Sequence, residues 1–81
     1  MNVPKPYEEI IDFIAAGSTP EGVAGFRPST AAQRRVATLV ERSKVGQASV
    51  EEQSELEDYL QLEHLMVMAK ARARHFTQLA P

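Results

Sequence analysis

The sequence predicts an all-α fold in one domain that spans residues 1–81. Apolar residues recur at helical spacing in several stretches, and Gly or Pro separates these stretches. No stretch alternates apolar and polar residues in the manner of a strand. The connections between the expected helices are short, so successive helices should pack as neighbours. We expect two helices of moderate length, a short helical turn between them, and a long C-terminal helix.

The first expected helix covers residues 5–17. Pro6 suits its first turn, and Gly17 suits the position that follows the last turn of a helix. Its apolar residues have the spacing i, i+3, i+4, i+7 that is typical of one buried helix face: Tyr7, Ile10, Ile11 and Ile14.

A single helical turn follows at residues 19–25. Thr19 provides an N-cap side chain, and Pro20 occupies the first helical position. Phe26 comes directly after this turn, and we expect it to fold back onto the core.

The second full helix covers residues 30–45. Either Ser29 or Thr30 caps its start, and Gly46 ends it. Its inner face should carry the apolar residues Ala32, Val36, Leu39 and Val40.

The last segment, residues 50–79, is predicted to be one long helix. Ser49 and Glu52 have the spacing of a capping box, which places the start of the helix. No Gly or Pro follows until Pro81, so the helix is about 30 residues, or roughly 45 Å, long. A compact domain of this size is only about 25–30 Å across. Part of the long helix should therefore project from the domain or meet a partner.

The middle of the long helix is apolar on more than one side. At about 100° per residue, Leu60 and Val67 point one way, whereas Leu62 and Leu65 point nearly the opposite way. A helix that is apolar all round is normally buried all round. Two explanations remain open: one side of this stretch is an intermolecular interface, or the two shorter helices sandwich it.

Composition limits the classes of function. The formal net charge of −2 argues against a domain that holds nucleic acid through its overall charge. The chain has no Cys, which excludes disulfides and thiolate–metal sites and leaves oligomerisation or a partner to stabilise so small a core. No signal peptide is recognisable, and no apolar run approaches the roughly 18 residues of a membrane span, so we expect a cytoplasmic protein.

No catalytic or cofactor-binding pattern is recognisable. His64 and His75 are eleven residues apart, about 16 Å along one helix, so they cannot bind the same metal ion. The acidic residues at the start of the long helix are explained by the capping box and the helix dipole. The segment Gly22–Gly25 is too short for a phosphate-binding loop and follows no strand. We therefore expect no enzyme activity, no metal and no cofactor.

The C-terminal end of the long helix is basic. Lys70, Arg72 and Arg74 alternate with alanines, so a partner surface can approach closely. Three explanations remain open: a solvated helix end, contact with the acidic active site of another protein, and contact with nucleic-acid phosphates. A second basic group on the preceding helix would add to a nucleic-acid site if it faces the same way: Arg34, Arg35 and Arg42.

Several of these features occur together in known proteins. The long helix has a capped acidic start, the central sequence Leu-Glu-His-Leu-Met and the end Ala-Lys-Ala-Arg-Ala, and Arg27-Pro28-Ser29 precedes the helix before it. In these features the segment from about residue 13 to residue 75 resembles a family of short bacterial proteins, many of them cyanobacterial. Many members look like antitoxins encoded beside small nuclease toxins of the PIN or HNH kind. The resemblance implies a protein that binds and neutralises a partner nuclease.

We therefore expect a small helical protein-binding module, with an antitoxin-like role toward a nuclease. The apolar centre of the long helix would lie in a groove of the partner, and the basic tail would reach the acidic site of the nuclease. Two alternatives remain: a DNA- or RNA-binding regulator, and a self-associating module in which two long helices pair as a homodimer. The residues expected to contact a protein partner are Leu62, Leu65, Met66, Met68, Lys70, Arg72, Arg74 and Phe76.

Overall fold

The computed structural model describes residues 5–79, which form four helices: α1 (Pro6–Ala15), α2 (Pro20–Ala24), α3 (Thr30–Lys44) and α4 (Val50–Leu79). None of the described residues forms a strand. The all-α prediction is confirmed, and each expected segment begins and ends within two residues of the observed helix.

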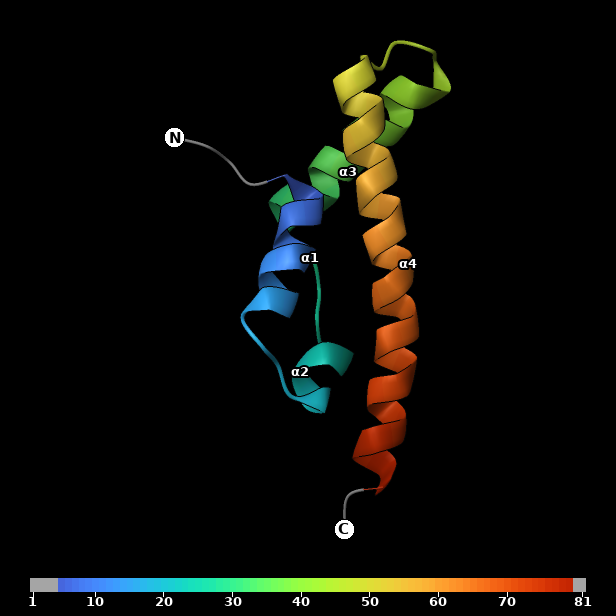
Figure 1. Cartoon of the computed structure of the whole chain (residues 1–81). Coiled ribbons are helices and arrows are strands. Elements are labelled where there is room, and N and C mark those ends of the chain that lie inside the picture. Colours follow the sequence, from blue (N-terminus) through green and yellow to red (C-terminus); the bar gives the residue numbers. More distant parts are fainter. Residues whose placement is uncertain (1–4, 80–81) are drawn as a thin grey trace.

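The three shorter helices lie along α4 (Figure 1). α3 packs beside the start of α4, α1 beside its middle, and α2 beside its C-terminal half. The molecule is elongated, with extents of 51 × 28 × 18 Å. Most of α4 therefore has another helix beside it, and only its last turns extend beyond α2.

A short loop turns the chain between α3 and α4. Gly46 has a φ of 72°, a left-handed conformation that glycine adopts without the steric cost of a side chain. The Gln47 N–H donates to the Arg42 carbonyl at 2.8 Å, which closes the end of α3. α4 then begins with the predicted capping box. The Glu52 N–H donates to Ser49 Oγ at 3.0 Å, and the Ser49 N–H donates to Glu52 Oε1 at 2.9 Å.

α2 and α3 also begin with side-chain caps. The Gly22 N–H donates to Thr19 Oγ1 at 3.1 Å, and the Ala32 N–H donates to Ser29 Oγ at 3.0 Å. Ser29, and not Thr30, is therefore the cap of α3.

Glu9 joins α1 to the start of α3. Its carboxylate accepts hydrogen bonds from the Ser29 N–H, at 3.0 Å, and from the Ser29 hydroxyl group. The negative charge also lies at the positive end of the α3 dipole. These contacts join α1 to α3 without involving α4.

The hydrophobic core lies between α1 and α4. Its centre is a contact cluster of Ile10, Tyr59 and Met66. Phe26 folds back onto this cluster as predicted, and the centre of its ring lies 4.6 Å from that of Phe13. Further buried apolar residues are Ala32, Leu39, Leu56 and Ala73.

The apolar middle of α4 is covered on one side only. Leu60 and Val67 remain 47% and 57% exposed, and Leu65 and Met68 remain 46% and 54% exposed. The explanation that two shorter helices sandwich this stretch is therefore wrong. The physical reason is that all the shorter helices follow the same side of α4, so its flanks stay uncovered.

The capping box gives a test of where α4 starts. Ser49→Ala removes the side-chain acceptor of the Glu52 N–H and should lower the free energy of unfolding by about 1 kcal/mol. Ser54→Ala changes an exposed serine inside the same helix and is the matched control, for which we expect no loss. Urea denaturation followed by circular dichroism measures both variants. Equal stability of Ser49→Ala and the wild type would contradict the capping role.

Candidate functional site

The predicted partner-binding residues on α4 differ in burial. Met66 is only 4% exposed and belongs to the core with Ile10 and Tyr59, so its expected role as a partner anchor is wrong. Leu62 is half-buried against the same cluster. The predicted anchors that remain about half exposed are Leu65, Met68 and Phe76.

A row of residues along one flank of α4 forms a continuous strip, which we call the Leu65 face. Its residues are spaced alternately by four and three positions, so they stay on one side of the helix over about five turns. The strip is apolar at its centre, with a carboxylate near one end and a guanidinium near the other. Its members are Asp58, Leu62, Leu65, Ala69, Arg72 and Phe76.

α1 widens the Leu65 face. Ile11 and Ile14 are 45% and 49% exposed, although the sequence pattern placed both on a buried stripe. Ile10 alone among these isoleucines is buried, because the stripe is wider than the contact that α1 makes with α4. The sequence signal that could have indicated these exposed side chains is the large number of apolar residues on so short a helix. A surface groove between the two helices is lined by Tyr7, Ile11, Asp58, Gln61 and Leu62.

The opposite flank of α4 carries Leu60 and Val67, and we call it the Val67 face. Positions 65 and 67 lie about 160° apart around the helix axis, so one flat partner surface contacts only one of the two faces. A second, smaller groove opens on this flank. Its lining includes Phe26, Pro28, Glu63, Val67 and Lys70.

The three cations of the basic tail point in different directions. Arg72 and Arg74 are both exposed, and they also lie about 160° apart, so Arg72 belongs to the Leu65 face and Arg74 lies beside the Val67 face. Lys70 Nζ lies 6.0 Å from the centre of the Phe26 ring, within the range of a cation–π interaction. A partner docked on one face therefore meets one of the two arginines.

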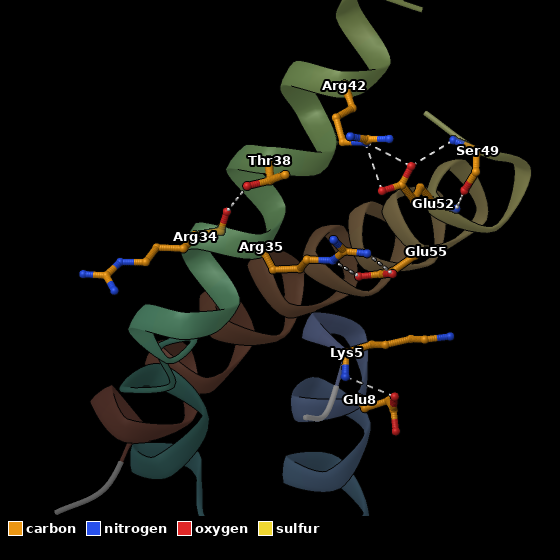
Figure 2. A network of polar contacts seen from close by, with 9 residues as sticks. All are labelled: Lys5, Glu8, Arg34, Arg35, Thr38, Arg42, Ser49, Glu52 and Glu55. Carbon is orange, nitrogen blue, oxygen red and sulfur yellow. Dashed lines mark hydrogen bonds and ion pairs between the residues drawn. The ribbon is translucent and has the colours of Figure 1, made fainter. Parts of the chain in front are cut away.

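Arg35 on α3 is used inside the chain (Figure 2). Its Nε and Nη2 atoms donate to the two carboxylate oxygens of Glu55, at 2.9 and 3.0 Å. Glu55 is only 6% exposed, and this bidentate geometry compensates its buried charge. The hydrogen bond to Glu55 is the main cause that raises the pKa of Arg35 above its ordinary value.

Arg42 is also paired within the chain. Its Nε donates to Glu52 Oε1 at 3.0 Å, and its Nη2 donates to the Gln47 carbonyl at 3.2 Å, so it links α3, the loop and the start of α4. Arg34 points away from α4, on the other side of α3 (Figure 2). The three arginines of α3 therefore do not form one basic patch, because two of them face α4 and one faces away from it.

Two further ionisable groups have shifted pKa values. The hydrogen bond from the Ser49 N–H lowers the pKa of the Glu52 carboxyl group, and Arg42 lowers it further. Burial raises the pKa of the Tyr59 phenol, and the carboxylates of Glu63 and Glu9 add to this shift. The lowered pKa of Glu52 favours the carboxylate that forms the capping box. The raised pKa of Tyr59 favours the neutral phenol that packs in the core.

Over residues 5–79, no group of three His, Cys, Asp or Glu side chains lies close enough together to hold a metal ion. Another groove lies where α1, α3 and α4 meet, and three of its charged lining residues, Glu9, Arg35 and Glu55, already hydrogen-bond within the chain. No helix in the described part of the chain combines the length and the apolar character that crossing a membrane requires.

The Arg35–Glu55 pair gives a test of how α3 is held on α4. Arg35→Ala leaves the buried Glu55 carboxylate without its partner and should lower the free energy of unfolding by about 2 kcal/mol. Arg34→Ala removes the neighbouring arginine, which points into solvent, and should change it by less than about 0.5 kcal/mol. Urea denaturation compares the two variants. Similar losses in both would show that the buried pair contributes nothing specific.

No protein-family model, curated protein or solved structure matches this chain.

Proposed function

We propose that this protein is a small helical protein-binding module whose docking surfaces are the Leu65 face and the Val67 face of α4. The observation that carries the proposal is the exposure of large apolar side chains outside the core. Apolar side chains gathered on an exposed helix face are typical of protein–protein contact sites. Across α1 and α4, these side chains are all close to half exposed: Ile11, Ile14, Leu60, Leu65, Val67, Met68 and Phe76.

These side chains contribute little to the fold of the isolated chain. Met66 fills the core with Ile10 and Tyr59, whereas its neighbours Leu65 and Val67 are not part of that cluster and stay about half exposed. Burying their remaining apolar surface would add about 25 cal/mol of stabilisation per Å². A partner groove or a second helix that accepts α4 provides this burial, as in the recognition of amphipathic helices.

The narrower form of the proposal is an antitoxin-like function, in which the partner is a nuclease. Its support is the resemblance to antitoxin-like proteins together with the position of two arginines. Each face of α4 has one exposed guanidinium in its C-terminal part, that of Arg72 on the Leu65 face and that of Arg74 beside the Val67 face. Metal-dependent nucleases gather carboxylates, with which a guanidinium forms bidentate hydrogen bonds. Docking through either face would bring one guanidinium to such a site.

The alternative of a nucleic-acid-binding regulator has less support. Arg35 and Arg42 form ion pairs with carboxylates of α4, at 2.9 and 3.0 Å, and Lys70 lies over an aromatic ring. The formal net charge of −2 adds no general attraction for phosphates. The apolar faces are therefore the better-supported interaction surfaces.

Photo-crosslinking in living cells tests the two faces. A photo-reactive residue replaces Leu65 or Val67, one position at a time. We expect cross-linked protein products from both positions, because both side chains would lie inside an interface. Arg34 is the control position, since it is exposed on α3 and belongs to neither face. Gel mobility and mass spectrometry give the mass and the identity of each product.

The products separate the general proposal from its narrower form. Absence of products from positions 65 and 67, or equal products from position 34, would contradict the protein-binding module. A nuclease in the products supports the antitoxin-like form. Products that contain only proteins of other classes would contradict that form and leave the binding module standing.

A further inference from the structure

We propose that the Leu65 face binds a second copy of this chain, with the two α4 helices antiparallel and the two-fold axis close to Leu65. This inference rests on the proposed function, because it names the partner of one of the two docking faces. The observation behind it is the order of charged and apolar residues along the Leu65 face. When two copies of this face meet with their helices in opposite directions, the charges of one copy lie beside opposite charges of the other.

The charges on the Leu65 face are placed symmetrically about its centre. Asp58 lies seven residues before Leu65, and Arg72 lies seven residues after it. In an antiparallel pair centred on Leu65, Asp58 of each copy lies beside Arg72 of the other, so the interface contains this charge pair twice.

The two charges have no such contact within one chain. Asp58 and Arg72 are about 21 Å apart along the same helix. The ion pairs found among residues 5–79 join Arg35 to Glu55 and Arg42 to Glu52, and neither involves these two residues. Asp58 and Arg72 are therefore available to a partner.

The apolar residues between the charges fit the same arrangement. The alternating spacing of four and three positions is that of helices that pack along their length. Leu65 lies at the axis against its own counterpart, and Leu62 lies opposite Ala69 of the second copy, where the small side chain lets the helices approach. Ile11 of α1 lines a groove with Asp58 and Leu62 of the same face, and the partner helix would cover part of its exposed surface.

The direction of the pair follows from the charge gradient of α4. The exposed carboxylates Glu51, Glu57 and Asp58 lie near its start, and the exposed guanidinium groups of Arg72 and Arg74 lie near its end. A parallel pair would place like charges together and align the two helix dipoles in the same direction. An antiparallel pair places opposite charges together and sets the two dipoles in opposite directions. The Val67 face stays uncovered in this dimer and remains available to a different protein.

Charge reversal tests the arrangement in the purified full-length chain. Asp58→Arg or Arg72→Glu alone gives a homodimer with two like-charge contacts, and we expect its dissociation constant to rise about tenfold or more in sedimentation equilibrium. An equimolar mixture of the two variants forms a heterodimer in which both contacts again join opposite charges. We expect this mixture to associate as tightly as the wild type. Recovery by mixing requires contact between two chains. The direction follows from the single variants, because a parallel pair already has like-charge contacts in the wild type, so that neither variant would weaken it and the mixture would associate more tightly than the wild type.

Two further variants complete the test. Arg74→Glu makes the same change of charge about 160° away around the helix and should leave the dissociation constant unchanged. Leu65→Asp places two carboxylates at the axis and should abolish the dimer, while circular dichroism shows an unchanged helix content because Leu65 is already 46% exposed.

The outcomes distinguish this inference from the proposed function. A wild-type chain that is monomeric at high micromolar concentration, or a variant mixture that does not recover association, overturns the dimer. If position 65 then cross-links to a different protein, the protein-binding module stands and only the self-pairing is wrong. If the chain is monomeric and positions 65 and 67 give no cross-link, both proposals are wrong.

Discussion

The contact of Ile10 with Tyr59 and Met66 decides which side of α4 lies inside the molecule. α1 has ten residues and α2 has five, and helices this short are unstable in water unless they pack on something larger. Among the described helices, only α4 is long enough for both of them to pack on it, so the short helices lie along one side of α4. Its two flanks remain outside for the same reason. The exposed apolar surface is thus a direct consequence of a core built on one side of a single long helix.

Charged residues reinforce this arrangement and also polarise α4. Glu55 and Glu52 are paired with Arg35 and Arg42, so part of the acidic start of α4 is compensated inside the chain. Because Glu55 is buried, the fold requires its ion pair with Arg35. An unpaired carboxylate at this position would lower the free energy of unfolding by several times the amount that an ion pair on the surface contributes. Exposed carboxylates remain near the start of the helix, and exposed guanidinium groups remain near its end. This separation of charge gives the Leu65 face a direction as well as an apolar centre.

The size of the core links stability to association. The central cluster has three buried residues, and the aromatic contact of Phe13 with Phe26 closes one end of it. A chain of 81 residues buries a smaller share of its surface than a large domain does, so each additional buried side chain matters. Anything that binds the folded chain and not the unfolded one adds to its stability by mass action. A partner on the Leu65 face would therefore contribute both function and folding free energy.

Local signals in the sequence are enough to place the helices of this protein. Capping by Ser49, termination at Gly46 and the first-turn prolines act within a few residues of the chain, so the bounds follow from the sequence to within two residues. The return of Phe26 to the core was also predictable, because a lone aromatic residue between two turns has few other places to pack. The same local reasoning named part of the exposed apolar surface, Leu65, Met68 and Phe76, but not the isoleucines of α1 or the residues of the Val67 face.

Only the tertiary structure decided between neighbouring residues of the same kind. Leu65 and Met66 are both apolar, and Arg34 and Arg35 are both basic, yet one of each pair faces inward and the other faces solvent. Helical spacing tells which residues share a face, but it does not tell which face a distant helix will cover. That choice depends on the angle at which α1 and α3 return to α4, which is set by contacts between residues far apart in the chain.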